Sequence, residues 1–108
     1  MTKMEIAHTI KNRIIKSIKP KSIVLFGSVA RGIEREDSDI DILVIWDEQR
    51  ELPNVKRRII LRKIIGMVES PLDILTCTSE ELYKALEDKN SFTSKIVSEG
   101  ELIYGRLN

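Results

Sequence analysis

The sequence predicts an α/β (α+β) domain in which helices flank a small mixed β-sheet. Three observations support this class. Short β-branched apolar runs occur at Ser22–Phe26, Asp39–Trp46 and Leu72–Cys77, as in buried strands. Other segments repeat apolar residues every three or four positions, as in amphipathic helices. The two kinds of segment alternate in the order α-β-(α)-β-α-β-α-α-β, which is typical of this class.

Length and composition restrict the domain count and the compartment. The 108 residues fit one domain spanning positions 1–108, and no region resembles a linker. The 18 lysines and arginines nearly balance 17 acidic residues, so we do not expect direct nucleic-acid binding. The longest apolar run, Ile42–Trp46, is too short to span a membrane. With Cys77 as the single cysteine, a reducing cytoplasmic location is expected.

The first part of the chain should form a helix, a strand and a loop. Isoleucines recur every fourth residue from Ile6 to Ile18, and the helix they predict ends at Lys19-Pro20. The strand Ser22–Phe26 follows. Val29–Ser38 is polar and contains Gly32, so we expect one helical turn and then a loop before the strand Asp39–Trp46.

The second part should hold three more helices and two strands. A helix is predicted over Val55–Val68, with a solvated basic face and an apolar stripe at Val55, Ile59, Ile60, Ile64, Met67 and Val68. The strand Leu72–Cys77 precedes Thr78 and Glu81, which have capping-box spacing. After the helix that they begin, a last short helix should end at Gly100, and Glu101–Gly105 should form a closing strand.

Aspartates inside apolar strands are the clearest sign of a functional site. Asp39 and Asp41 are two residues apart, so they point to the same face of a strand, about 6–7 Å apart at the backbone. Asp73 can join them if its strand is a neighbour. Three adjacent carboxylates repel one another unless a proton or a cation compensates them. Oxygen ligands suit Mg²⁺, and two such ions activate an attacking oxygen and steady a leaving one.

A phosphate site is predicted just upstream. Gly27 and Ser28 end the first strand, where glycine allows close approach and exposed N–H groups suit a phosphate. Arg31 can add positive charge to the same turn. Together with the aspartates, these residues indicate attack on a nucleoside triphosphate.

The pattern Gly27-Ser28, ten residues, then Asp39-Ile40-Asp41 resembles the signature of the DNA polymerase β-like nucleotidyltransferase superfamily. The flanking "GSVARG" and "SDIDILV" are similar to its short prokaryotic branch, the minimal nucleotidyltransferases. The resemblance implies a nucleotidyltransferase fold and two Mg²⁺ ions held by Asp39, Asp41 and Asp73. It also implies a triphosphate at Gly27 and Ser28, with Arg31 typical of the branch, and transfer of AMP from ATP to a hydroxyl.

The resemblance also implies a partner. Minimal nucleotidyltransferases often act with a HEPN-domain RNase toxin, which they neutralise by binding or by adding AMP to a tyrosine. We therefore expect the antitoxin of a type VII-like toxin–antitoxin pair. Two alternatives stay open at this point: a binding-only antitoxin without catalysis, and an adenylyltransferase for a small antibiotic-type molecule.

A calcium loop is a competing interpretation of the same aspartates. Asp37, Asp39 and Asp41 occupy positions 1, 3 and 5 of an EF-hand, and Glu48 occupies position 12. Position 6 should be glycine but is Ile42, and the intervening residues have a strand pattern. We therefore favour the strand.

Overall fold

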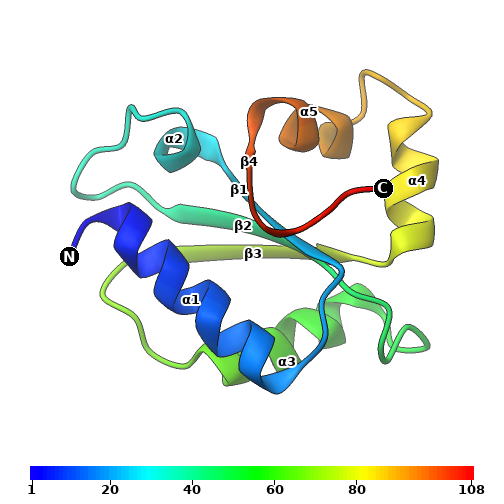
Figure 1. The fold of residues 1–108 in the computed structure, drawn as a ribbon, viewed down its shortest axis with the longest axis horizontal. Helices are drawn as coiled ribbons and strands as arrows, with labels where there is room; N and C mark the ends of the chain where they lie inside the picture. The colour runs from blue at the N-terminus through cyan, green and yellow to red at the C-terminus, as the bar shows by residue number, and fades with distance from the viewer.

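One four-stranded mixed β-sheet runs through the middle of the molecule (Figure 1). The structure is a computed structural model, and it describes residues 1–108. The strand order is β3-β2-β1-β4. The strands are β1 (Ser22–Phe26), β2 (Ile40–Ile45), β3 (Leu72–Cys77) and β4 (Glu101–Gly105). The predicted fold class and all four strands are therefore confirmed, although β2 is shorter at each end than predicted.

The strand directions follow from the lengths of the connections. β1 is antiparallel to both β2 and β4, whereas β2 and β3 are parallel. A parallel pair requires a crossover, and helix α3 (Asn54–Ile65) provides it between β2 and β3. This parallel pairing brings the beginnings of β2 and β3 to the same end of the sheet.

Helices cover both faces of the sheet (Figure 1). Helix α1 (Lys3–Ser17) and α3 pack on one face, and α4 (Ser79–Leu86) and α5 (Phe92–Glu99) pack on the other. Helix α2 (Gly27–Ala30) is a single turn that begins directly after β1, two residues earlier than predicted. No helix here combines the length and the apolar character that crossing a bilayer requires.

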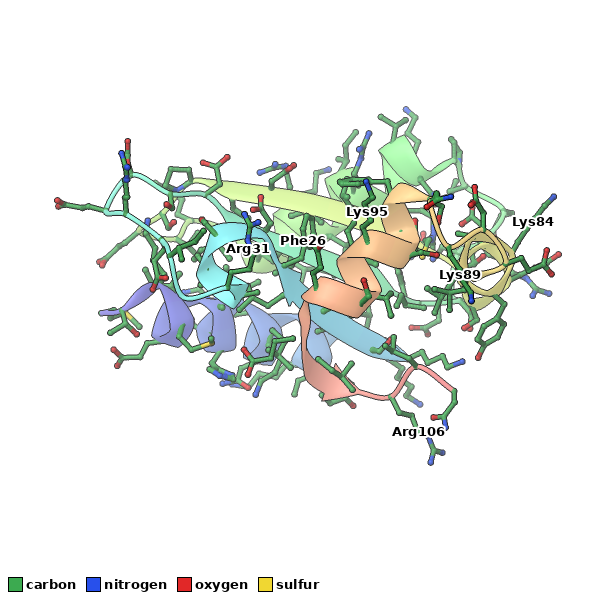
Figure 2. The ribbon with its side chains drawn as sticks, turned by 90° about the horizontal axis from the view of Figure 1, so that it is seen from above. Phe26, Arg31, Lys84, Lys89, Lys95 and Arg106 are labelled. Atoms are coloured by element: carbon green, nitrogen blue, oxygen red, sulfur yellow. The ribbon has the colours of Figure 1, made fainter.

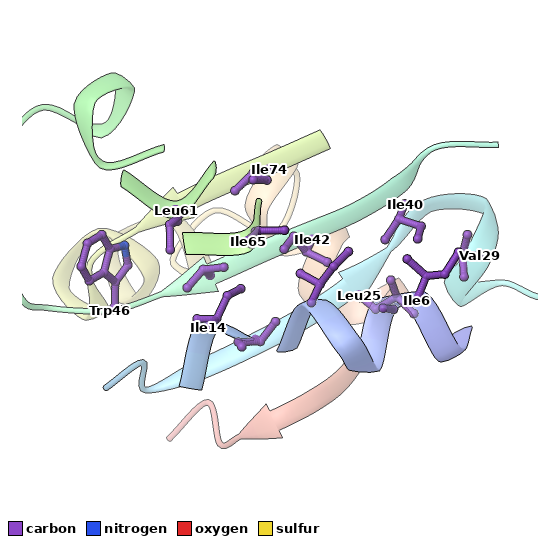
Figure 3. Packing of buried hydrophobic residues seen from close by; sticks show 14 residues of the cluster. Ile6, Ile14, Leu25, Val29, Ile40, Ile42, Trp46, Leu61, Ile65 and Ile74 are labelled. Carbon is purple, nitrogen blue, oxygen red and sulfur yellow. The ribbon is translucent and has the colours of Figure 1, made fainter. Parts of the chain in front are cut away.

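Strand β2 separates two apolar cores. Ile40, Ile42 and Val44 face the larger core, where α1 and α3 pack (Figure 3). Leu43 and Ile45 face the smaller core under α4 and α5. A strand buried on both faces is apolar at nearly every position, which explains why a carboxylate in it is conspicuous.

Two capping boxes fix the helix starts. The Thr78 Oγ1 accepts a hydrogen bond from the Glu81 N–H at 3.1 Å, and the Thr78 N–H donates to Glu81 Oε1 at 2.9 Å, as predicted. The same arrangement joins Thr2 and Glu5 at the start of α1, where it was not predicted. Each box satisfies two backbone donors that the helix leaves free.

The prediction for α3 is wrong in its end and its buried face. The helix ends at Ile65, because Gly66 takes a φ of +66°, which favours glycine and stops the helix. Met67 beyond it is 92% exposed. Val55 and Ile59, predicted to be buried, are 53% and 47% exposed. The buried positions are Arg57, Leu61 and Ile65.

Arg57 is buried because its guanidinium binds the chain that leads into α3. It donates to the backbone carbonyl of Trp46, to Glu48 O at 3.3 Å and to Asn54 Oδ1 at 3.1 Å. It also lies 4.5 Å from the centre of the Trp46 ring. Trp46 is fully buried, and its Nε1 donates to Thr76 Oγ1 at 2.7 Å, so this ring cannot stack on a nucleobase.

We expect the substitution Arg57→Met to lower the free energy of unfolding by about 2–4 kcal/mol, because it leaves buried carbonyls without a donor. Lys56→Met, on the exposed side of the same turn, should change it by less than about 0.5 kcal/mol. Urea titrations of both variants measure the difference. Equal stability of the two variants would show that the Arg57 contacts do not stabilise the fold.

Candidate functional site

The aspartates of β2 and β3 meet at one end of the sheet. In the parallel register Asp41 lies directly opposite Asp73, and in the antiparallel register Asp41 lies opposite Phe26, the last residue of β1. Residues paired in this way point to the same face. Asp41 and Asp73 are therefore neighbours, as the sequence predicted for adjacent strands.

Asp39 lies just before β2 rather than inside it, but its side chain belongs to the same group. It precedes Asp41 by two residues, and its charge contributes to the environment of the Asp41 carboxylate. Asp39 and Asp73 are exposed, and Asp41 is half-buried. We call these three residues the carboxylate cluster. It lies on the face that α4 and α5 cover, at the end of β2 and β3 where those strands begin.

Gly27 is required at the start of α2 because of Asp41. Its φ is +74°, and a Cβ at this position would overlap Oδ2 of Asp41. The Asp41 carboxylate thus lies against the Gly27 backbone, in space that a side chain would fill. The sequence predicted a glycine that admits a ligand, whereas the structure shows that it first admits the aspartate.

Ser28 and Arg31 occupy the two ends of the turn that follows. Ser28 is in the first turn of α2, whose leading N–H groups have no acceptor within the helix. The Arg31 N–H closes the turn on Gly27 O at 3.2 Å, and its side chain is exposed. Gly27 and Ser28 therefore adjoin the carboxylate cluster, and Arg31 lies one turn farther away.

The electrostatics of the cluster are unfavourable without a ligand. Partial burial, and then the charges of Asp73 and Asp39, raise the pKa of Asp41 from its usual 3.8 to about 6. No lysine or arginine lowers the pKa of this carboxyl. An uncompensated group of this kind either takes up a proton or binds a cation.

The donor set fits a hard divalent cation. Carboxylate oxygens are the ligands that Mg²⁺ prefers, and Asp41 has no cationic side chain to neutralise it. The three side chains do not yet form a closed ligand group, since no three acidic, histidine or cysteine side chains converge closely enough to hold a metal. Mutual repulsion explains this, because Asp39 and Asp73 are exposed and free to turn toward water.

The competing calcium loop is wrong. Residues Ile40–Ile45 form β2, so no loop connects Asp37 to Glu48. Glu48 lies beyond the other end of that strand, where its carboxylate accepts a hydrogen bond from the Lys19 N–H at 3.0 Å. His8 and most of the basic face of α3 are exposed, as expected, with Arg57 the exception.

Comparisons with known proteins agree with this site. The family model described as "Polymerase beta, Nucleotidyltransferase" matches residues 8–107. A Methanocaldococcus jannaschii relative named "Putative protein adenylyltransferase" is 36% identical over 104 residues, covering 93% of this chain and 91% of the relative.

Two solved structures share the fold. A crystal structure titled as a "putative nucleotidyltransferase" from Sulfolobus solfataricus aligns with a TM-score of 0.67 and 20% identity, over 94% of this chain and 79% of that one. A structure titled "toxin-antitoxin with AMP-PNP" aligns with a TM-score of 0.59 and 22% identity, over 98% and 75%.

The raised pKa of Asp41 has a consequence for stability. A carboxyl whose folded pKa exceeds its unfolded pKa favours the protonated native state, so its contribution is present below about pH 4 and is lost as the pH rises through 6. Asp41→Asn removes this charge at constant size. With EDTA present, we expect the variant to exceed the wild type by about 1–2 kcal/mol at pH 7.5 and to match it near pH 4. Thermal melts across this range measure the effect, and a variant less stable at pH 7.5 would contradict it.

Proposed function

We propose that this chain, which belongs to the polymerase β nucleotidyltransferase family and is a nucleotidyltransferase, transfers AMP from ATP to a hydroxyl group. The observation that carries the proposal is the register of Asp41 with Asp73, beside the Gly27 backbone. The name of the M. jannaschii relative supports adenylyl transfer in particular. That structural neighbour's title also includes AMP-PNP, an ATP analogue.

Each site residue has a proposed part in the reaction. The acceptor oxygen bonds to the α-phosphorus, the bond from this phosphorus to the β-phosphate bridging oxygen breaks, and pyrophosphate leaves. Asp73 favours loss of the acceptor proton, since it is the most accessible carboxylate on β3. Gly27 and Ser28 hold the triphosphate through backbone N–H groups and a hydroxyl, and Arg31 adds positive charge.

Divalent cations complete the proposed site. Asp39, Asp41 and Asp73 would hold two Mg²⁺ ions, which supply neutralising charge for the triphosphate and for the leaving oxygen. The raised pKa of Asp41 supports this role, because such a carboxyl gains most from a cation. Without cations, the repulsion between the carboxylates and the triphosphate would oppose binding.

The proposed acceptor is a tyrosine of a HEPN-type toxin, with this chain as the antitoxin of a type VII-like pair. The relative's name, which specifies a protein substrate, and the toxin–antitoxin title of the neighbour support it. The surface beside Asp73 supports it too. A hollow of about 250 Å³ there is lined by Val55, Ile59, Arg58 and Arg62 of α3 together with Asp73.

This surface has the character of a protein-binding site. Val55 and Ile59 are one helical turn apart, and each is about half exposed. Arginines flank them, and arginine is enriched in protein interfaces. An acceptor chain that packs on these two side chains would bring a hydroxyl close to Asp73.

Incubation with α-³²P-labelled ATP, Mg²⁺ and the cognate toxin should label the toxin. We expect the Asp39→Asn, Asp41→Asn double variant to lower labelling by at least about 10³-fold, because it removes both β2 carboxylates from the metal site. Asp37→Asn is the matched control, since Asp37 is exposed and outside the cluster. Autoradiography of the separated proteins gives the result.

The alternatives predict other outcomes. Labelling that persists in the double variant would disprove the metal site. A double variant that still neutralises the toxin, when the wild type does not label it, would indicate a binding-only antitoxin. Pyrophosphate release with a hydroxylated small molecule, and none with the toxin, would indicate a small-molecule adenylyltransferase.

A further inference from the structure

A second wall faces the Gly27–Ser28 turn, and no motif predicted it. A surface hollow of about 260 Å³ lies between the turn and α5. Phe26, Gly27 and Arg31 line one side, and Phe92, Lys95 and Glu99 of α5 line the other. Among the surface hollows of the fold, this is the one that includes a residue of the turn. It therefore adjoins the proposed triphosphate site.

Cations from both walls line this hollow. Figure 2 shows Phe26 between Arg31 on α2 and Lys95 on α5. Both cationic side chains are exposed, and one carboxylate, Glu99, lies a helical turn after Lys95. Neither cation affects the pKa of Asp41, so they are not spent on neutralising the carboxylate cluster. The hollow thus carries a net positive charge beside a negative cluster.

Helix α5 holds Lys95 in a defined position. The Phe92 ring packs edge-on against the Phe26 ring, with centroids 6.4 Å apart and planes at 88°. Because Phe26 directly precedes Gly27, this contact joins α5 to the turn. Ser91 caps the helix by accepting from the Ser94 N–H at 3.1 Å, and Ile96 is buried in the smaller core.

The order of charges suits a nucleoside triphosphate. Its α-phosphate must reach the carboxylate cluster, where the acceptor attacks. Its β- and γ-phosphates then extend past Gly27 toward the hollow with Arg31 and Lys95. During transfer the bond from the α-phosphorus to the bridging oxygen breaks, and its electron pair stays on the pyrophosphate. Two cations from opposite walls stabilise that developing charge.

We propose that Lys95 is a substrate-binding residue, which with Arg31 holds the β- and γ-phosphates of the nucleotide and the pyrophosphate that leaves. This inference rests on the proposed function and deepens it, because it assigns the leaving-group side of the site to α5. Lysine binds phosphate as a point charge, so an exposed position on the rim of a hollow suits it.

Calorimetric titration with two probes tests the assignment: MgATP, and Mg²⁺ with inorganic tripolyphosphate, which has no base or ribose. We expect Lys95→Ala to weaken both by about 5- to 30-fold, and by the same factor, because the lost contact is to phosphate. Lys95→Arg should retain most of the affinity. Lys89→Ala is the matched control, since Lys89 is exposed and lies away from the hollow (Figure 2).

Three results would overturn the inference. The first is that Lys95→Ala binds both probes as Lys89→Ala does. The second is that Lys95→Ala weakens MgATP alone, which would assign Lys95 to the base or ribose. The third is that the wild type binds MgATP but not tripolyphosphate. A wild type that binds neither probe would instead refute the proposed function, and the inference with it. Melting temperatures of the variants confirm that each is folded.

Discussion

The site depends on one cross-strand register: Phe26, Asp41 and Asp73 lie side by side on three neighbouring strands. A slip of one residue in β2 would turn Asp41 into the larger core and expose Ile40 or Ile42. The apolar residues of β2, which are buried on both faces, oppose this slip. The packing energy of two cores therefore keeps a carboxylate where electrostatics alone would not.

That constraint explains the neighbouring features. Gly27 lacks a side chain because the Asp41 carboxylate occupies the space next to it. The same contact brings the first turn of α2 against the carboxylates, so that the proposed phosphate and metal sites are adjacent. Charge repulsion within the cluster raises the pKa of Asp41, and a divalent cation relieves that repulsion. The fold thus holds a high-energy arrangement that a metal–nucleotide complex stabilises.

Local patterns in the sequence predicted the parts of the site that depend on local geometry. The two-residue period of a strand predicted that Asp39 and Asp41 share a face, and short β-branched runs predicted all four strands. The meeting with Asp73 could be predicted only conditionally, because it requires β2 and β3 to be parallel neighbours. That pairing depends on how the α3 crossover packs, which no local pattern determines.

Contacts between distant segments account for what the sequence did not predict. Arg57 looked like one more exposed cation of α3, and its burial depends on carbonyls of the preceding loop that accept its hydrogen bonds. Lys95 is likewise an ordinary helical lysine until α5 packs beside the Gly27 turn. Phe92 offered a weak signal, as one of only two phenylalanines in the chain, but its partner is the other one, 66 positions earlier.

The central claim is that the side chains of residues 39, 41 and 73 form one cation site beside Gly27. Paramagnetic broadening by Mn²⁺, a substitute for Mg²⁺, tests it most directly in ¹⁵N spectra. The account predicts that substoichiometric Mn²⁺ broadens the amide signals of residues 27–28, 39–41 and 73 together, and that Asp41→Asn with Asp73→Asn removes this broadening. Broadening centred instead on Glu80 and Glu81, which follow the other end of β3, and unchanged in that double variant, would contradict the account.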